Sequence, residues 1–309
     1  MKLLVAFFKL IRWPNLFFIA LTQCLFFFCV FERMMQVALN YQAHVLFYLL
    51  VTASVFISAA GYIINDYFDR SIDAVNKPQK LVIDRVIKRR WAIVWHWILS
   101  GAGILISLYV SYRIRSWVIG PANIVAVLLL WFYSTTFKKK LLSGNIIIAA
   151  LTAWVLVVVY FFCGSHISFW HVNTVSTGAR FFKFTVLYAG FAFIVSLIRE
   201  VVKDMEDMDG DAKYGCKTMP IVWGVPTSKV FTAVWLVVCI SALAIVQLYA
   251  WQLGYRVTCI YTAVLVILPL IYILRNLYKA TTPAHYHQLS TNIKLVMLAG
   301  ILSMLFFIF

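Results

Sequence analysis

Nine long apolar stretches recur along the chain, and they limit the folds that it can adopt. An α-helix needs about 20 mainly apolar residues to cross the hydrocarbon of a bilayer. Stretches of about this length lie at residues 15–31, 44–65, 91–110, 117–135, 145–163, 182–199, 230–251, 258–276 and 291–309. With 63% hydrophobic and 12% charged residues, the chain carries more apolar surface than one water-soluble core requires. The sequence therefore predicts an all-α, polytopic membrane bundle of nine transmembrane helices.

The basic residues fall between the apolar stretches and do not form one basic face. The net charge of +16 therefore does not indicate a protein that binds nucleic acid. If the segment before residue 15 is cytoplasmic, 21 of the 27 Lys and Arg residues lie on that side. The remaining six are Arg33, Arg113, Arg115, Arg180, Lys183 and Arg256. This asymmetry obeys the positive-inside rule. We expect an integral protein of the cell inner or plasma membrane, with a cytoplasmic N-terminus and the C-terminus on the opposite side.

The acidic residues are distributed even less evenly. Ten of the eleven lie in residues 66–84 or 200–211, and Glu32 is the exception. Both acidic segments begin where an apolar stretch ends on the expected cytoplasmic side. Acids at the C-terminal end of a helix face an unfavourable helix dipole, so their presence there calls for another explanation.

Three aspartates in each acidic segment are separated by three and then four residues. The first set is Asp66, Asp69 and Asp73, and the second set is Asp204, Asp207 and Asp211. On a helix this spacing puts the carboxylates on one face, where they repel one another. A divalent cation removes the repulsion, and Mg²⁺ is commonly held by a few carboxylates together with waters and substrate phosphates. The two sets predict Mg²⁺ held against a diphosphate. The alternative is a pair of solvated helix ends whose acids balance nearby Lys and Arg residues.

Basic residues close to these sets can donate hydrogen bonds to diphosphate oxygens that the metal does not reach. The candidates are Arg12, Lys77, Lys138, Lys203 and Lys217. The alternative for any one of them is a contact with lipid headgroups.

Four sequence elements together resemble the UbiA-type intramembrane prenyltransferases over nearly the whole chain. They are Asn65 to Asp73 followed by Asn76-Lys77-Pro78, Asp204 to Asp211 followed by Gly215-Cys216-Lys217-Thr218, Arg12-Trp13-Pro14-Asn15, and Tyr133-Ser134 with Lys138 and Gly144-Asn145. The resemblance implies a central cavity with both aspartate sets at its cytoplasmic mouth. It also implies a single integral-membrane domain over residues 1–309, and we expect weakly analogous halves at about 1–144 and 145–290.

The resemblance further implies roles for individual residues. The six aspartates would bind Mg²⁺ and act in catalysis. The side chains that would surround the diphosphate or the reacting carbon are Asn65, Lys77, Tyr133, Lys138 and Lys217, and the further substrate-binding candidates are Arg12, Asn15 and Lys203. When the diphosphate leaves, the allylic fragment becomes positively charged, and an aromatic face can stabilise that charge. We expect Tyr133, together with Tyr62 and Tyr67, to lie near the positively charged allylic fragment.

The second acidic segment looks most like the branch that contains geranylgeranylglycerol-phosphate geranylgeranyltransferase, which forms the second ether bond of an isoprenoid glycerolipid. The implied partners are an isoprenyl diphosphate donor, expected to be of geranylgeranyl length, a lipid-phosphate acceptor and membrane lipid. Two alternatives remain. One is prenylation of an aromatic acid such as 4-hydroxybenzoate, and the other is a membrane transporter, whose acids would be expected near the middle of the spans.

Overall fold

The computed structural model describes residues 2–76, 82–83, 86–165 and 172–307. Within these ranges the chain forms helices and loops without a β-strand, and an isolated β-bridge joins Ile83 and Ile87. The chain divides into two compact units. Unit 1 is Met1–Lys138 with Trp154–Val186, and unit 2 is Lys139–Ala153 with Leu187–Phe309. The single domain with weak halves stays a prediction.

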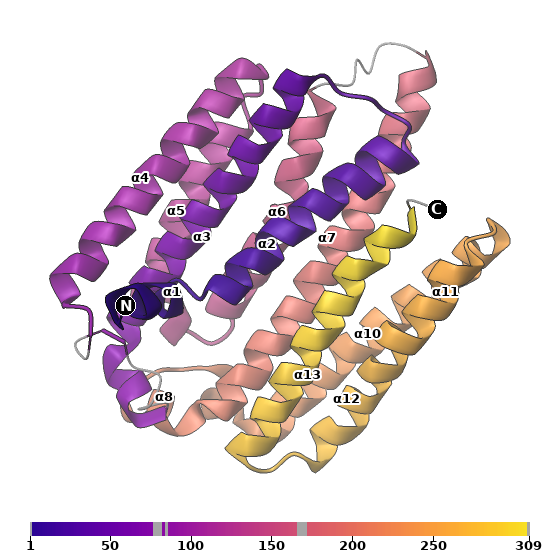
Figure 1. Ribbon diagram of the computed structural model, residues 1–309. Helices are drawn as coiled ribbons and strands as arrows, with labels where there is room; N and C mark the ends of the chain where they lie inside the picture. Colours follow the sequence, from indigo (N-terminus) through magenta and orange to yellow (C-terminus); the bar gives the residue numbers. More distant parts are fainter. Residues whose placement is uncertain (1, 77–81, 84–85, 166–171, 308–309) are drawn as a thin grey trace. The chain divides into compact units, whose positions relative to one another are not determined.

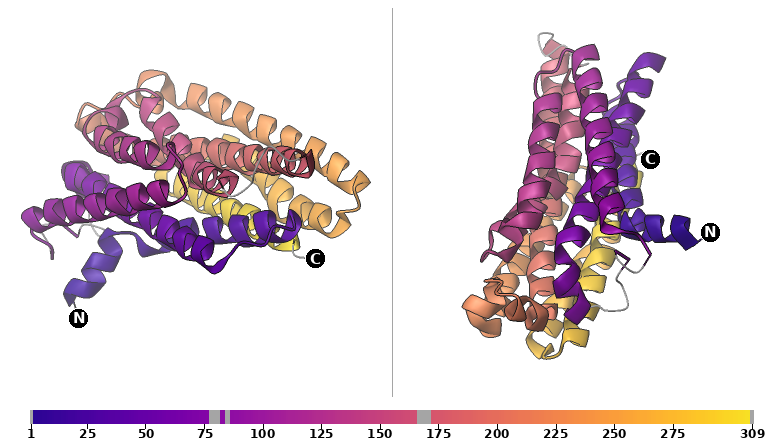
Figure 2. Two further views of the ribbon diagram at one scale, coloured as in Figure 1. Left: turned by 90° about the horizontal axis from the view of Figure 1, so that it is seen from above. Right: turned by 90° about the vertical axis from the view of Figure 1, so that its left-hand side faces the viewer.

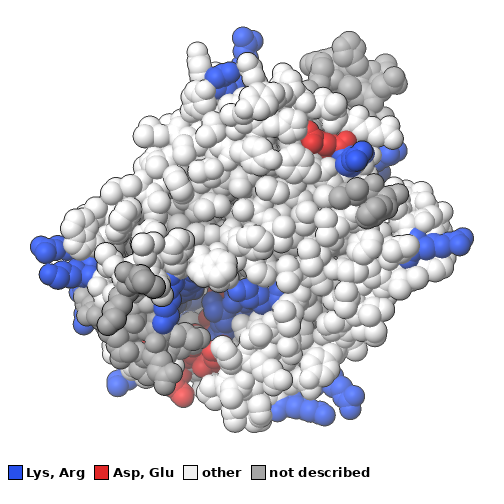
Figure 3. All heavy atoms as spheres, viewed as in Figure 1, with Lys and Arg blue, Asp and Glu red and all other residues white. Residues whose placement is uncertain are grey.

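Eight helices in the described ranges are long and apolar enough to cross a membrane. They are Trp13–Met34, Tyr41–Asn76, Arg89–Arg113, Ser143–Gly164, Gly178–Glu206, Gly224–Gln252, Arg256–Lys279 and Pro283–Phe307. The prediction of a polytopic helical membrane protein is confirmed, and uncharged residues make up most of the face seen in Figure 3. The expected span at 117–135 corresponds to α5 (Ile119–Thr135), which has 17 residues. That is about 26 Å of helix, slightly less than the hydrocarbon thickness, so a count of nine stays a prediction.

Unit 1 begins with three helical elements and continues with three longer helices that lie side by side in Figure 1. The elements are α1 (Lys2–Leu10), α2 (Trp13–Leu25), the π-helix η1 (Phe26–Met34), α3 (Tyr41–Asn76), α4 (Arg89–Arg113) and α5. Small residues let α3 and α4 approach closely, and His96 Nδ1 of α4 lies 3.0 Å from the backbone oxygen of Ala60 in α3. Stacked rings hold η1 against α3, with the centroids of Phe27 and Phe47 3.9 Å apart.

The two long helices α6 (Ser143–Gly164) and α7 (Val172–Glu206) contribute residues to both units. The remaining elements belong to unit 2. They are α8 (Met208–Lys213), α9 (Met219–Val222), α10 (Gly224–Gln252), α11 (Arg256–Thr262), η4 (Ala263–Ile267), α12 (Leu268–Lys279), α13 (Pro283–Leu302) and η5 (Ser303–Phe307). Leu236, Leu270 and Ile293 come from α10, α12 and α13 and are fully buried in one core with residues of α7.

Two elements differ from what hydropathy predicts. Helix α3 continues to Asn76 instead of ending near residue 65, so the first aspartate set lies within a helix. Helix α1 precedes the first expected span and is separated from it by a turn at Arg12, which has a φ of 51°.

Gly101 and Gly103 of α4 offer a matched pair for testing the contact between α3 and α4. A Cβ at Gly103 would lie 2.7 Å from Ile57 Cγ1 and 3.3 Å from the backbone oxygen of Ala53, whereas a Cβ at Gly101 would meet nothing within 4 Å. We expect Gly103→Ala to lower the melting temperature, because overpacking costs about 1–3 kcal/mol. Gly101→Ala should keep or raise it, because alanine favours a helix. Thermal unfolding in detergent measures both, and equal melting temperatures would contradict the close contact.

Candidate functional site

Helix α3 carries the first aspartate set without interruption. Asp66, Asp69 and Asp73 are therefore aligned along one helix face, as their spacing predicts. Asp69 is only 3% exposed, whereas Asp66 and Asp73 are partly exposed. A carboxylate removed from water in this way needs a positive or hydrogen-bonding partner.

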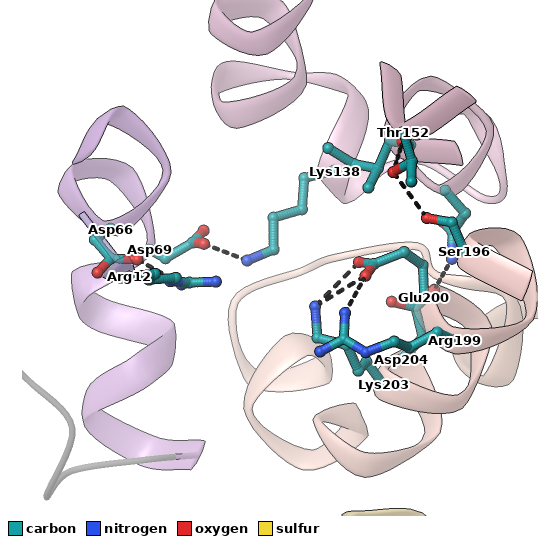
Figure 4. Close-up of polar contacts among 12 residues, drawn as sticks. Arg12, Asp66, Asp69, Lys138, Thr152, Ser196, Arg199, Glu200, Lys203 and Asp204 are labelled. Carbon is teal, nitrogen blue, oxygen red and sulfur yellow. Dashed lines mark hydrogen bonds and ion pairs between the residues drawn. The ribbon is translucent and has the colours of Figure 1, made fainter. Parts of the chain in front are cut away.

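Two cations from other elements of unit 1 pair with this row, as Figure 4 shows. Arg12 Nη2 lies 2.6 Å from Asp66 Oδ1, and Lys138 pairs with Asp69. Arg12 occupies the turn before α2, and Lys138 lies in the 3₁₀ turn η3 (Phe137–Lys139) after α5. Loss of water acts to lower the pKa of each cation, but the paired carboxylate, a nearby tyrosine and Asp73 together outweigh it and raise the pKa above its ordinary value. Both side chains therefore stay charged.

Three further predicted residues lie close to these pairs. The phenol of Tyr133, near the end of α5, acts with Asp69 to raise the pKa of Lys138. The backbone N–H of Asn15 donates to the oxygen of Arg12 at 2.8 Å. Asn65 Oδ1 is buried and has no hydrogen-bond partner among the described residues. A buried acceptor of this kind beside a row of carboxylates is suited to a cation or a donor group from a ligand.

The rings of Tyr62 and Tyr67 already face arginine side chains. The guanidinium carbon of Arg12 lies 5.3 Å from the ring centroid of Tyr62, and that of Arg89 lies 4.8 Å from the ring centroid of Tyr67. Both distances are typical of cation–π contacts. These two rings can therefore bind a cation, although here the cations belong to the protein.

The second aspartate set spans a break between two helices of unit 2. Helix α7 ends at Glu206, Asp207 has a φ of −97° and a ψ of 6°, and α8 begins at Met208. Asp204 belongs to the last turn of α7, and Asp211 is buried in α8. The single helical face that the spacing predicts is therefore interrupted at Asp207.

Asp204 has a partner that the sequence analysis did not assign to it. Asn145, buried near the start of α6, donates a hydrogen bond from Nδ2 to Asp204 Oδ2 at 2.8 Å. The Gly144-Asn145 element of the sequence was the available signal, but it gave no partner. The amide neutralises no charge, so it leaves the negative charge of this carboxylate available to a metal ion.

Glu200 is a second residue that received no role from the sequence. It lies one helical turn before Asp204 and is 8% exposed. Lys203 Nζ approaches Glu200 Oε2 at 3.0 Å, and Arg199 Nη1 approaches Glu200 Oε1 at 3.2 Å (Figure 4). Lys203, predicted to bind diphosphate, thus has a carboxylate partner in its own helix. The signal for Glu200 was its position one turn ahead of the aspartates.

The structure gives little evidence for diphosphate binding by the last two predicted cations, Lys217 and Lys77. The side chain of Lys217 is exposed, and its backbone N–H donates to the oxygen of Lys139 at 2.8 Å. Lys77 lies outside the described residues.

Across the described part of the chain, no three Asp, Glu, His or Cys side chains are grouped so as to hold a metal ion. The physical reason is visible on α3, where positions 66 and 73 are about 10 Å apart along the helix. The donor set nevertheless fits Mg²⁺, which often uses one or two carboxylates and takes its remaining ligands from waters and substrate phosphates. The buried oxygen of Asn65 adds a neutral oxygen beside the first set.

The fold and these residues define an integral membrane protein with carboxylate sets at the ends of two of its long helices. Residues 10–296 match the model of the UbiA prenyltransferase family. The chain belongs to this family.

Similar curated proteins carry the name digeranylgeranylglyceryl phosphate synthase. The protein from Haloquadratum walsbyi is 32% identical over 194 residues, which are 62% of this chain and 61% of that protein. The protein from Methanoregula boonei is 30% identical over 225 residues, which are 71% of each chain. The protein from Thermococcus sibiricus is 28% identical, and the match covers 62% of it. The chain thus spans about three fifths of the length of the first and third of these relatives.

Solved structures share the fold. A structure of digeranylgeranylglyceryl phosphate synthase in membranes is 24% identical, with a TM-score of 0.63 over 98% of this chain and 99% of the other. A UbiA homologue from Archaeoglobus fulgidus bound to DMAPP and Mg²⁺ is 16% identical, with a TM-score of 0.60 over 96% and 98% of the two chains. At these identities the likeness establishes the fold.

The pairing of Lys138 with Asp69 can be tested through stability. We expect Lys138→Met to lower the free energy of unfolding by on the order of 3 kcal/mol, because Asp69 would stay buried without its partner. The double variant Lys138→Met/Asp69→Asn should recover most of this loss. The comparison comes from denaturing the parent, Lys138→Met, Asp69→Asn and the double variant in one detergent. If the loss in the double variant equals the sum of the two single losses, the pairing is ruled out.

Proposed function

We propose that this protein transfers a prenyl group from its diphosphate to a hydroxyl group of a phosphorylated lipid, forming an ether bond. Membership of the UbiA prenyltransferase family supports prenyl transfer as the reaction. The observation that carries the proposal is the aspartate row on α3 with Arg12 and Lys138 paired to it. This arrangement brings oxygen ligands for a metal and cationic donors for a diphosphate to one helix.

Prenyl transfer breaks the bond between C1 of the donor and a diphosphate oxygen. The bonding electrons leave with the diphosphate, so negative charge grows on the leaving group and positive charge grows on the allylic carbon. When bound, Mg²⁺ would stabilise the charge on the leaving group. The carboxylates that would hold Mg²⁺ are those of Asp66, Asp69 and Asp73 in unit 1 and those of Asp204, Asp207 and Asp211 in unit 2.

Arg12 and Lys138 would bind the diphosphate directly. Each is a charged donor that pairs with one carboxylate of the row, and each can exchange that partner for a phosphate oxygen. Asn15, Asn65, Lys77, Lys203 and Lys217 are proposed as further contacts to the substrates.

Tyr133 would stabilise the allylic carbon with its ring face. The acceptor hydroxyl oxygen then forms the new bond to C1, and its proton passes to an oxygen of the released diphosphate. Apolar helices around the reacting groups would exclude water, which would otherwise capture the allylic cation.

Two cations beside the second aspartate set support a phosphorylated acceptor. Arg199 and Lys203 both approach Glu200. Arg199 Nε is buried and has no hydrogen-bond partner among the described residues, so this guanidinium retains a charged donor that can bind an acceptor phosphate. Several relatives are named digeranylgeranylglyceryl phosphate synthase, which supports geranylgeranyl diphosphate as donor and geranylgeranylglycerol phosphate as acceptor. Prenylation of an aromatic acid such as 4-hydroxybenzoate stays the alternative, because its carboxylate suits the same cations.

Purified protein should be incubated with labelled geranylgeranyl diphosphate, Mg²⁺ and each acceptor in turn. We expect the label to move to geranylgeranylglycerol phosphate, and EDTA to abolish the transfer. Transfer to 4-hydroxybenzoate alone would replace the proposed acceptor, and transfer that persists in EDTA would refute the role of Mg²⁺.

The positive-inside distribution supports a cytoplasmic site and N-terminus. Because the charged donor does not cross a bilayer, sealed inverted vesicles should be active and sealed right-side-out vesicles inactive; the reverse would overturn this topology.

Aspartates inside and outside the two sets provide a matched series. Asp69→Asn and Asp207→Asn should each reduce kcat/KM on the order of 100-fold, as expected when one charged group that stabilises a leaving group is lost. Asp209→Asn is the control, because Asp209 is exposed in α8 and lies outside the spacing of the second set. It should retain activity within about twofold. Equal losses in all three variants would show that activity depends on the total negative charge of these segments and not on the two aspartate sets.

A further inference from the structure

Helix α1 runs across the direction of the spanning helices of unit 1. The right-hand view of Figure 2 shows α1 leaving the line of α2 and α3. The change of direction occurs at Arg12, whose φ of 51° and ψ of 53° end the helical path. The nine residues of α1 extend about 14 Å, which is too short to cross a bilayer. A short helix that runs across the spans has the direction of a helix lying along a membrane surface.

Helix α1 has a buried side and an exposed apolar side. Ala6 and Leu10 are buried in a core that includes Leu16 of α2 and Ile63 of α3. Large apolar residues of the same helix are 48–67% exposed, namely Leu3, Leu4, Val5 and Phe8, and the last three lie on the side away from Ala6 and Leu10. Lys9 is exposed next to them. An apolar face bordered by a basic residue is the pattern of a helix that lies in the headgroup region.

The start of α4 continues this surface. The ring centroids of Phe7 in α1 and Trp95 in α4 are 5.0 Å apart, so the two helices are in contact. Lys88 and Arg90 are exposed at the beginning of α4, and Trp91 is 53% exposed. Tryptophan favours the boundary between headgroups and acyl chains, and basic residues at that depth attract anionic lipids.

We propose that α1 and the start of α4 form a docking surface for the anionic lipid headgroups of the bilayer. Leu4 and Phe8 enter the boundary between headgroups and acyl chains, and Lys9, Lys88 and Arg90 bind headgroup phosphates. The exposed apolar side of α1, its direction across the spans and the basic residues beside it are all explained by one partner, the headgroup region of the bilayer. The surface ends at the Arg12 turn, so the bilayer contacts the protein next to the Arg12–Asp66 pair. This inference does not depend on the proposed prenyl transfer.

The depth of α1 can be measured with a fluorescent label on full-length Leu4→Cys protein in vesicles. The control is Leu105→Cys, which is 68% exposed in the middle of α4, and labelled parent protein corrects for the native cysteines. We expect lipids brominated near the headgroup to quench the Leu4→Cys label, and lipids brominated deep in the chain to quench the Leu105→Cys label. Quenching of the Leu4→Cys label by aqueous iodide alone, or at the same depth as the control, would overturn the proposal.

The charge preference needs a second measurement. Binding of short-chain phosphatidylglycerol to detergent-solubilised protein should be about 25-fold weaker in Lys88→Gln/Arg90→Gln, which corresponds to about fivefold for each charge removed. The matched control is Arg113→Gln/Lys183→Gln, which removes one exposed Arg and one exposed Lys elsewhere in unit 1 and should change binding less than twofold. Equal weakening in both variants, or equally tight binding of phosphatidylcholine, would refute an anionic docking surface. No diphosphate is present in either assay, so failure of the proposed enzymatic function would leave the result unchanged.

Discussion

A bilayer offers no hydrogen bonds to peptide groups, and this constraint decides where the polar chemistry of the protein can lie. Backbone groups within the hydrocarbon must be satisfied inside helices, as they are in the eight spans. Irregular backbone is then confined to places where the helices end. Three such places carry residues of the aspartate sets or their cationic partners: the turn at Arg12, the η3 turn with Lys138, and the break at Asp207. Asp66, Asp69 and Asp73 instead lie within α3, which continues beyond the apolar stretch without interruption.

Within each unit, carboxylates at the helix ends are stabilised by different means. In unit 1, Asp66 and Asp69 are paired with Arg12 and Lys138. Such pairs lose much of their attraction to the cost of removing both charges from water, so an apolar substitute of similar volume would often stabilise a fold as well. What the pairs provide is charge that can change partners when an anion binds. In unit 2, Asn145 donates a hydrogen bond to Asp204. The amide is neutral, so this contact adds no positive charge that would compete with a metal ion.

The sequence predicted the spans and the acidic residues of the site better than their partners. Hydropathy located α3 but not its end, because the helix continues through charged residues to Asn76 while the apolar stretch stops at residue 65. Helix α1 was missed because nine residues are too few for the window that identifies spans. The break at Asp207 carries no strong signal, since the Met and Glu residues beside it favour a helix. The bond between Asn145 and Asp204 joins residues 59 positions apart, and no local pattern predicts such a contact.

The turn at Arg12 connects the backbone constraint with the site. A left-handed conformation costs a non-glycine residue about 1–2 kcal/mol, and Arg12 adopts it. Contacts that follow from this conformation offset the cost: an ion pair with Asp66 and a cation–π contact with Tyr62. A glycine at this position would remove the backbone strain, but it would leave Asp66 without its positive partner. The side-chain contacts of arginine thus offset its backbone strain, as is common where strain is localised at a functional site. The same turn directs α1 away from the line of α2, so one residue both separates α1 from the first span and supplies a cation to the aspartate row.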